Sequence, residues 1–371
     1  MTRLAVTMDA RKARDFGIGS YVRGLLGALA RRGDLSLTAL VRSGDAALLP
    51  EGVGAVPCDA REYSLAEPLA VRRALSAAPR GVLHAPHYVV PLFPPVATVV
   101  TVHDLIHLQR PEHASPLRRA YARTMIRRAL RAARVVLTVS EAVRRDLVAF
   151  FPAAAAKVRV VPNGVDGRFL SSPTADERSR LRSSRALSFP YVVFLGNDKP
   201  HKNLPGLLRA WSLLATEVRG ERRLVLAGGA PQRAGVRKAL ARDAGLPDGA
   251  VVDLGVVADA EVAPLLAEAE ALVLPSFAEG FGLPVLEAEA VGTPVVCSDR
   301  GGLPEAAGDG ALLVDPGNDG ALSGAIARLL ADGALRRTLG ERGRRRAAAF
   351  TWDAAAEAVA KAYRDAAAGS A

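Results

Sequence analysis

A repeated alternation of short apolar segments with helix-forming segments limits the fold of this chain more than any other feature. The segments expected as strands in the first half are Leu4–Met8, Ser36–Val41, Gly81–His84, Ala97–Val102, Arg134–Val139 and Val158–Val161. Those in the second half are Tyr191–Leu195, Arg223–Leu226, Val251–Leu254, Ala271–Leu274, Pro294–Cys297 and Ala311–Val314. Because helices separate successive strands, the pattern predicts parallel sheets with helices on both faces. We therefore expect an α/β chain with two Rossmann-like, doubly wound domains.

A polar stretch divides the two runs of strands and helices. Residues 171–188 are rich in serine and arginine, and they contain the Pro-Thr-Ala-Asp cap signal of one short helix. We expect an N-terminal domain over residues 1–170, a linker over 171–188 and a C-terminal domain over 189–350. Residues 351–371 contain a last helix, Asp353–Ala367, which can pack on either domain. Of these two arrangements, we favour packing back on the N-terminal domain.

Length and composition exclude several classes of protein. Half of the 371 residues are apolar and 23% are charged, which excludes disorder over most of the chain. The longest nearly uncharged run, Tyr88–Val102, contains three prolines and is too short for a membrane span. Residues 1–14 lack the apolar core of a secretory signal, and two cysteines, Cys58 and Cys297, cannot form a disulfide framework. We therefore expect a cytoplasmic protein.

Positive charge is concentrated in the first half of the chain. Residues 1–172 hold 25 basic and 13 acidic residues, a net of +12, whereas the remainder holds 24 and 25, a net of −1. Much of the excess lies on the helix expected after Pro116. One of its faces carries Arg119, Arg123, Arg127, Arg131 and Arg134, and the opposite face carries Tyr121, Met125, Ala129, Ala132 and Ala133.

Two interpretations of this basic face stay open. It is a solvated outer surface, or it attracts anionic lipids or an anionic acceptor and brings the protein to the inner face of the membrane as a peripheral protein. Nucleic-acid binding is not expected, because aromatic residues make up only 5% of the chain.

The segment Phe277–Glu289 carries the strongest chemical signal. It reads FAEGFGLPVLEAE and follows an expected strand directly, with glycines for a tight turn and Pro284 for the first turn of a helix. Three amides would point out of that helix N-terminus toward a phosphate, those of Phe281, Gly282 and Leu283. Glu279 would precede the phosphate and Glu287 would lie about one turn into the helix, so both can flank one ligand. The alternative is an ordinary Gly-rich turn with two surface glutamates.

With these two glutamates, the segment resembles the donor-site motif of family 4 retaining glycosyltransferases, which have the GT-B fold. The resemblance covers nearly the whole chain in the family's order. Its other landmarks are Gly17-Ile-Gly19-Ser-Tyr21, Val102-His103-Asp104-Leu105, Val139-Ser140-Glu141, Pro162-Asn163-Gly164-Val165-Asp166, Gly196-Asn-Asp-Lys-Pro-His-Lys202-Asn203, Ser298-x-x-Gly301-Gly302-x-Pro304-Glu305 and Thr351-Trp352. The Pro-His-Lys-Asn and Val-His-Asp-Leu forms are most similar to the mannosyltransferase branch.

The resemblance implies an architecture and a reaction. Two Rossmann-like domains would face each other across a cleft. A hexose, with mannose as the first choice, would move from a GDP- or UDP-linked sugar to a hydroxyl of a glycan, lipid-linked or small-molecule acceptor. The product would be an α-glycoside.

The resemblance also implies roles for individual residues. His103 and Glu279 would be catalytic, with Glu279 near the C3 hydroxyl of the sugar and His103 at its outer hydroxyls or at the acceptor. Glu287 would accept hydrogen bonds from the ribose hydroxyls. The other donor-binding residues would surround the diphosphate and stabilise its growing charge, and they are Gly17, Gly19, Asn197, Lys199, Lys202, Phe281, Gly282 and Leu283.

One position departs from the family pattern. Asn197 stands where many members have an arginine. The nearby Lys199 and His201 would then supply positive charge in its place.

Neither a metal nor another cofactor is expected. The chain lacks the Asp-x-Asp motif that holds a metal–diphosphate pair. The spacings His84-x2-His87 and His103-x3-His107 suit zinc, although histidines at separate strand ends would give the same spacings. The dinucleotide fingerprint is incomplete after Gly17-x-Gly19, and a Walker A motif is absent.

Two other functions remain as alternatives. A sugar-nucleotide epimerase or a phosphorylase could use the same fold, although the few lysines of the second half offer no clear pyridoxal site. A non-enzymatic basic adaptor for membranes or nucleic acid would not need Glu279 and Glu287 at one site.

Overall fold

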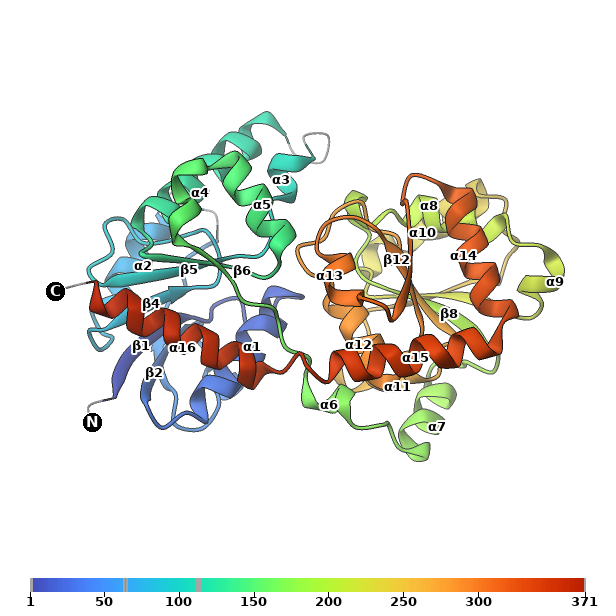
Figure 1. Cartoon of the computed structure of the whole chain (residues 1–371), viewed down its shortest axis with the longest axis horizontal. Helices are drawn as coiled ribbons and strands as arrows, with labels where there is room; N and C mark the ends of the chain where they lie inside the picture. The colour runs from blue at the N-terminus through green and yellow to red at the C-terminus, as the bar shows by residue number, and fades with distance from the viewer. Residues whose placement is uncertain (1–2, 63, 65, 111–114, 370–371) are drawn as a thin grey trace. The chain divides into compact units, whose positions relative to one another are not determined.

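The computed structural model describes residues 3–62, 64, 66–110 and 115–369 of the chain. Its internal contacts divide the chain into two compact units. The first unit comprises Met1–Gly164 and Phe350–Ala371, and the second comprises Val165–Ala349. Within each unit, helices cover a twisted sheet (Figure 1).

The first unit contains a seven-stranded sheet of order β3-β2-β1-β4-β5-β6-β7, in which all neighbouring strands are parallel. Its strands are β1 (Leu4–Asp9), β2 (Leu35–Val41), β3 (Gly54–Pro57), β4 (Val82–Ala85), β5 (Ala97–Val102), β6 (Val135–Thr138) and β7 (Val158–Val160). Six of them match the expected strands to within one or two residues. The pattern misses β3, because this edge strand is short, largely exposed and made of Gly-Ala-Val-Pro.

Helices cover both faces of this sheet. They are α1 (Ile18–Ala30), α2 (Glu67–Leu75), α3 (Ile106–Gln109), α4 (Pro116–Ala132), α5 (Glu141–Phe150) and α16 (Trp352–Ala368), with short 3-10 turns η1 (Ala46–Leu48) and η3 (Pro152–Lys157). On one face, α1 and α16 pack together over the large core. On the other face, Val71 and Leu75 of α2 pack against Leu40 and Leu83 of the sheet. Right-handed crossovers from β4 to β7 keep α4 and α5 on this second face, across the sheet from α16 (Figure 1).

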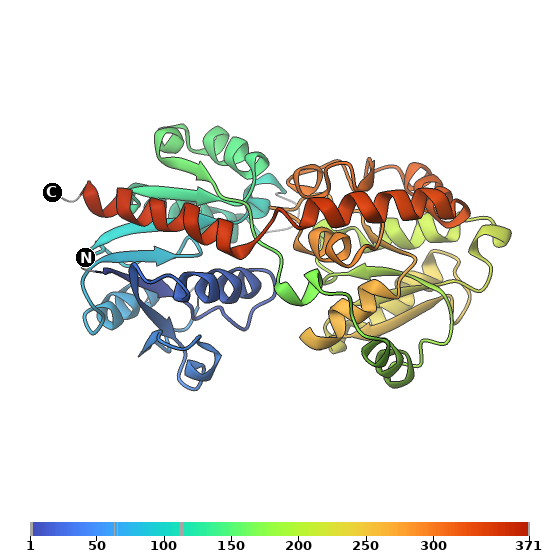
Figure 2. The same ribbon diagram turned by 60° about the horizontal axis from the view of Figure 1, so that its bottom comes forward.

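The C-terminal helix α16 belongs to the first unit. Thr351 caps its N-terminus by accepting a hydrogen bond from the backbone N–H of Ala354 at 3.1 Å. The side chain of Trp352 and its backbone fill the space beside Gly24 of α1 and Gly164, where any Cβ would overlap them. The chain therefore crosses from the first unit to the second after Gly164, and α16 brings it back (Figure 2).

The second unit contains a six-stranded parallel sheet of order β10-β9-β8-β11-β12-β13. Its strands are β8 (Tyr191–Leu195), β9 (Arg223–Ala227), β10 (Val251–Gly255), β11 (Ala271–Leu274), β12 (Val295–Ser298) and β13 (Ala311–Val314). Its helices and turns are α6 (Gly167–Leu170), α7 (Ala175–Ser184), η4 (Pro200–Lys202), α8 (Leu204–Ser212), α9 (Thr216–Arg219), η5 (Pro231–Arg233), α10 (Ala234–Asp243), α11 (Asp259–Ala267), α12 (Leu283–Val291), α13 (Leu303–Ala307), α14 (Asp319–Ala331) and α15 (Gly333–Ala347). The two sheets give the doubly wound α/β architecture that the sequence predicts.

The expected boundaries need correction. The units meet after Gly164 rather than after residue 170, and residues 171–188 do not form a separate linker. They contain α7, and a capping box formed by Thr174 and Glu177 stabilises the N-terminus of this helix. Ion pairs then tie this helix to the second unit, because Arg182 contacts Glu268 at 2.5 Å and Arg185 contacts Glu261 at 2.5 Å.

The basic helix α4 also differs in detail from the prediction. Its buried side chains are Ala122, Ile126, Ala129 and Leu130. Arg119 lies beside this buried face, since its Nε is buried. Arg134 is exposed but lies beyond the helix, where it donates to the carbonyl of Ala366 at 3.3 Å. Of the five predicted arginines, the helix itself therefore exposes Arg123, Arg127 and Arg131. In the described residues, no helix combines the length and apolarity needed to cross a bilayer.

Candidate active site

Glu279 and Lys202 form an ion pair at the carboxyl end of β11. The Nζ of Lys202 lies 2.5 Å from Oε1 of Glu279, and the two side chains are only 13% and 12% exposed. Ser276, which follows β11 and is fully buried, donates its hydroxyl to the same Oε1 at 2.7 Å. Two predicted site residues from distant segments are thus brought together, and the carboxylate is oriented by two donors.

The backbone of Glu279 is held by the glycine pair after β12. Gly302 donates its N–H to the carbonyl of Glu279 at 2.9 Å. Gly301 has φ +60°, and a Cβ at this position would overlap that carbonyl. Ser298 donates its hydroxyl to the carbonyl of Ser276 at 2.6 Å and so supports the same loop. Sequence reasoning noted Gly301 and Gly302 only as landmarks, whereas the structure shows why only glycine fits there.

Helix α12 begins where the motif predicts. Gly282 precedes it with φ 110° and ψ 50°, a conformation that favours glycine, and Pro284 lies in the first turn. A Cβ on Gly282 would lie 2.6 Å from Cδ2 of Leu303, so close packing also demands glycine. The amide of Leu283 therefore belongs to a first turn without intrahelical acceptors, where an anion is favoured.

Glu287 lies about one turn further along α12 and is partly buried. Burial raises the pKa of its carboxyl to about 7, Arg168 opposes this shift, and Asp166 and Asp259 add to it. Arg168 lies 3.9 Å from Asp166 and 3.7 Å from Asp259. Glu287 itself has no hydrogen bond or ion pair within the described residues. The prediction placed Glu287 at the site and missed these three neighbours.

The turn after β8 contains the other predicted donor-binding residues of this unit. The side chain of Asn197 accepts a hydrogen bond from the backbone N–H of Lys199 at 3.2 Å, and Lys199 is exposed. The carbonyl of His201 accepts from Phe277 N–H at 2.7 Å, which joins the turn to the loop that carries Glu279. Asn203 adopts the left-handed conformation and caps α8. This linkage brings Lys202 to Glu279.

A buried arginine beside this turn was not foreseen. Arg237 of α10 is 3% exposed, and its Nε lies 2.7 Å from Oδ2 of Asp253. It also contacts Asp198 at 3.4 Å, and Arg233 pairs with the same carboxylate. The position of Asn197 thus lies next to two arginines that acidic residues already hold. Sequence reasoning missed these two arginines because they lie more than 30 positions after Asp198.

The Gly-rich turn of the first unit opens α1. Gly17 is exposed, with φ 57° and ψ −75°, and it accepts from Tyr21 N–H at 3.0 Å through its carbonyl. Gly19 is buried, and a Cβ there would lie 2.7 Å from the carbonyl of Ala13. Gly19 therefore permits close packing, and Gly17 is the member of the pair whose backbone is open to a ligand.

His103 follows β5 and is held in one orientation. Its Nε2 donates to the carbonyl of Pro86 at 3.0 Å, so a neutral ring keeps its lone pair on Nδ1. Burial lowers the pKa of His103 to about 4, the hydrogen bond to Pro86 opposes the shift, and His87 adds to it. The ring packs edge-on against Tyr21 with centroids 4.6 Å apart. His103 is therefore neutral near pH 7.

A buried hydrogen-bond chain connects this region to the last helix. The hydroxyl of Tyr21 lies 2.9 Å from Thr101 Oγ1, which lies 2.8 Å from Nε2 of His84. Nδ1 of His84 lies 2.7 Å from the hydroxyl of Tyr363 on α16. Burial lowers the pKa of His84 to about 3, so this histidine is neutral and both ring nitrogens are satisfied.

The two histidines of the His84-x2-His87 spacing have other partners. His84 uses both nitrogens in the chain above, whereas Nε2 of His87 contacts Asp9 at 3.1 Å and its Nδ1 accepts from Val89 N–H. Among the described residues, no three His, Cys, Asp or Glu side chains converge as a metal would require.

Family models match most of the chain. The model described as "Glycosyltransferase Family 4" matches residues 17–168, and "Glycosyl transferases group 1" matches residues 176–346. The O-antigen chain mannosyltransferase B of Escherichia coli is 32% identical over 266 residues, which cover 72% of this chain and 70% of that protein. The MMP alpha-(1->4)-mannosyltransferase of Mycolicibacterium hassiacum is 35% identical over 62% of this chain, and the chain spans about half of that relative, 53% of its length.

Solved structures share the fold over the full length. The sucrose-phosphate synthase of Thermosynechococcus elongatus has a TM-score of 0.80 and 25% identity over 99% of this chain and 100% of that one. Anabaena Alr3699/HepE, solved with UDP-glucose, has a TM-score of 0.74 and 19% identity over 98% of this chain and 100% of that one. The chain therefore belongs to the family 4 glycosyltransferases of GT-B fold, in their mannosyltransferase-like branch.

Proposed function

We propose that the chain is a retaining hexosyltransferase that takes its sugar from a nucleoside diphosphate. The observation that carries the proposal is the pair of Glu279 and Lys202 in front of α12, a carboxylate and an ammonium 2.5 Å apart. Mannose is the first donor sugar to test, because two relatives are named mannosyltransferases. A GDP- or UDP-linked donor is proposed, and a fold neighbour was solved with UDP-glucose.

The donor would bind with its diphosphate against the N-terminus of α12. Lys202 and the amides of Gly282 and Leu283 would supply positive charge there, and we assign Phe281, Asn197 and Lys199 to the same site. Glu287 would accept hydrogen bonds from two ribose hydroxyls, a role that its unpartnered carboxyl permits. In the first unit, we assign the open backbone of Gly17 to the diphosphate, and we assign Gly19 to the close packing that shapes this turn.

During transfer, the bond between the anomeric carbon and the diphosphate oxygen breaks, and the diphosphate keeps the electron pair. The acceptor oxygen forms its bond to the same face of that carbon and gives its proton to the diphosphate. Lys202 would stabilise the leaving charge, and Glu279, on the sugar side near the C3 hydroxyl, would offer negative charge to a sugar ring on which positive charge develops. His103 offers the lone pair of Nδ1 to a sugar or acceptor hydroxyl. Since one carboxylate is assigned to the sugar, a long-lived covalent intermediate is not expected.

The reaction needs no metal in this proposal, because Lys202 and the helix N-terminus occupy the role of a divalent cation. The acceptor is a hydroxyl of a glycan, a lipid-linked sugar or a small molecule. We expect turnover to persist in EDTA. A loss of activity in EDTA that added Mg²⁺ restores would contradict this part of the proposal.

An NMR time course tests the reaction. Purified protein is mixed with GDP-mannose or UDP-glucose and methyl α-mannoside, with Glu279→Gln as the control. The expected first product is an α-glycoside together with the nucleoside diphosphate. A β-linked first product would overturn retention. Conversion of the donor to an epimeric sugar nucleotide, without transfer, would favour the epimerase alternative.

A further inference from the structure

One short part of the first unit carries most of the net charge of the chain. Residues 68–140 contain 11 arginines and two acidic residues, Asp104 and Glu112, a net of +9, against +11 for the whole chain. This part comprises most of α2, the loop between β4 and β5, α3 and α4. The positive charge is therefore a local feature of the fold, and a bias in overall composition does not account for it.

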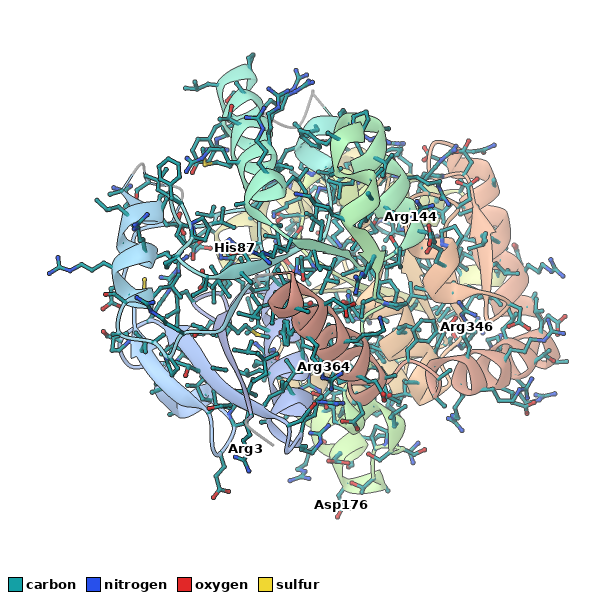
Figure 3. All side chains as sticks on the ribbon, turned by 60° about the vertical axis from the view of Figure 1, so that its left-hand side comes forward. Arg3, His87, Arg144, Asp176, Arg346 and Arg364 are labelled. Atoms are coloured by element: carbon teal, nitrogen blue, oxygen red, sulfur yellow. The ribbon has the colours of Figure 1, made fainter. Side chains whose placement is uncertain are left out.

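Helix α4 presents this charge to solvent along one line. Arg123, Arg127 and Arg131 follow each other at four-residue spacing, and all three are exposed. Within the described residues, their guanidinium groups have no hydrogen bond or ion pair. The helix contains no acidic residue. Nitrogen-tipped side chains reach out from it in Figure 3. These cations are thus available to an anionic partner.

Large apolar side chains are exposed in the same part of the chain. Phe93 is 83% exposed, Leu117 at the start of α4 is 81% exposed and Leu69 of α2 is 61% exposed. Exposed apolar side chains of this size, several in one region, are a mark of interaction surfaces. Their transfer from water to an apolar phase would be favourable.

Phe93 is held in its exposed position by a strained backbone. Its φ is +48°, a conformation that bulky residues rarely adopt. Nη1 of Arg72 on α2 donates to the carbonyls of Leu92 and Phe93 at 2.8 and 2.9 Å and so fixes the loop. In this conformation the Phe93 ring lies in water, and an exposed ring contributes nothing to folding. An interaction partner for the ring would explain this arrangement.

The apolar and basic groups lie on the same face of the sheet. Val96, at the end of the Phe93 loop, packs against the cluster formed by Val71 and Leu75 of α2 with Leu40 and Leu83. The right-handed crossover between β5 and β6 places α4 on this face as well. Helices α1 and α16 cover the opposite face.

We propose that this surface docks on an anionic lipid bilayer. It consists of Leu69, Phe93 and Leu117 with the arginines of α4, and we call it the α2–α4 face. Phe93 and Leu117 enter the boundary between headgroups and acyl chains, while Arg123, Arg127 and Arg131 bind lipid phosphates. A bilayer fits better than nucleic acid, because a phosphodiester backbone offers no apolar phase to two leucines. The inference does not depend on the donor chemistry proposed above.

Vesicle co-sedimentation of the full chain tests the proposal. The vesicles contain phosphatidylcholine alone or a mixture with phosphatidylglycerol, at about 0.1 M and about 0.5 M NaCl, where the Debye length falls from about 10 Å to below half of that. We expect binding to the anionic vesicles only, and much weaker binding at the higher salt. The triple variant Arg123→Gln, Arg127→Gln, Arg131→Gln should weaken it on the order of a hundredfold, at roughly fivefold per arginine.

A matched variant distinguishes loss of this surface from loss of net positive charge. Arg328→Gln, Arg337→Gln, Arg345→Gln removes three exposed arginines of the second unit that have no partner among the described residues, and it should bind like the parent chain. Phe93→Ser should weaken binding to anionic vesicles at both salt concentrations, because it removes the apolar contribution. Equal loss in both triple variants, equal binding to both kinds of vesicle, or an unchanged Phe93→Ser variant would each overturn the proposal. So would tighter binding to a mixed RNA than to the anionic vesicles.

Discussion

The ammonium of Lys202 lies 2.5 Å from the carboxylate of Glu279, although 77 positions separate the two residues. The pair holds opposite charges where the proposed reaction needs them, one at the leaving group and one at the sugar. Ser276 donates its hydroxyl to the same oxygen of that carboxylate, at 2.7 Å. Each member of the pair therefore affects the chemistry of the other.

Lys202→Met should lower kcat by about 10²–10³-fold, because the diphosphate loses a preorganised cation in the transition state.

Glu279→Gln should lower kcat strongly and change the Kd of the free nucleotide little, since its role concerns the sugar. Steady-state kinetics and calorimetry with GDP and UDP separate these effects. Lys238→Met, at an exposed position of α10, is the control for Lys202. If Glu279→Gln loses nucleotide affinity and keeps its turnover, the two glutamates have been assigned the wrong way round.

Glu287 should make nucleotide binding depend on pH. The pKa of its carboxyl is raised to about 7, and the ionised form accepts ribose hydroxyls. We expect affinity to increase from about pH 6 to about pH 8, with proton release on binding. Glu287→Ala should weaken binding by about 1–3 kcal/mol at the upper end of this range. Calorimetry in buffers of different ionisation enthalpy measures both the nucleotide affinity and the number of protons released on binding. Proton uptake, or an unchanged affinity in the variant, would remove Glu287 from the nucleotide site.

The same pKa has a consequence for stability. The folded-state pKa of Glu287 is about 7, above the ordinary value of 4.5. Its favourable contribution to the free energy of unfolding is therefore fully present below pH 4.5 and is lost as the pH rises toward about 7. Glu287→Gln should flatten this part of the pH dependence and stabilise the chain above it. Thermal unfolding at several pH values tests the sign. A larger stabilising effect of the substitution at pH 5 than at pH 8 would contradict the assigned pKa.

Gly301→Ala should reduce both stability and turnover. Its φ of +60° disfavours alanine, and the added Cβ would overlap the carbonyl of Glu279. We expect a loss of about 1–3 kcal/mol in unfolding free energy and a lower kcat, because the Glu279 loop must shift. Gly324→Ala is the matched control, since a Cβ there meets nothing within 4 Å and α14 favours alanine. Equal stability of the two variants would show that the loop adapts freely.

The sequence predicts the framework of this protein well, because the framework depends on local pattern. Four strands have the predicted bounds, among them Ala97–Val102 and Ala271–Leu274, where β-branched or apolar runs end at turn residues. The start of α12 is also predicted, since Gly282 and Pro284 determine it locally. The short exposed strand β3 has no such pattern and was missed.

The neighbours of the site could not be predicted, because they are tertiary contacts. The acidic and basic groups around Glu287 come from α6 and α11, and Arg237 reaches Asp198 and Asp253 from α10. Helical periodicity assigned Arg119 and Arg134 to the basic face, but packing buries Nε of one and ties the other to α16. A period describes angles around a helix and does not identify what lies beside it.

The hydrogen-bond chain from Tyr363 to Tyr21 should make the last helix necessary for the geometry around His103. Tyr363→Phe removes the partner of His84 Nδ1 in a fully buried place, and burial keeps His84 neutral with a pKa of about 3. We expect a loss of about 1–3 kcal/mol in unfolding free energy, the cost of an unsatisfied buried polar group. Glu357→Gln, exposed on the same helix and without a partner among the described residues, should have no such effect. Thermal unfolding measures stability, and the NMR shifts of His103 report its environment. Unchanged stability in Tyr363→Phe would mean that water replaces the hydroxyl, and unchanged His103 shifts would mean that the chain does not orient that ring.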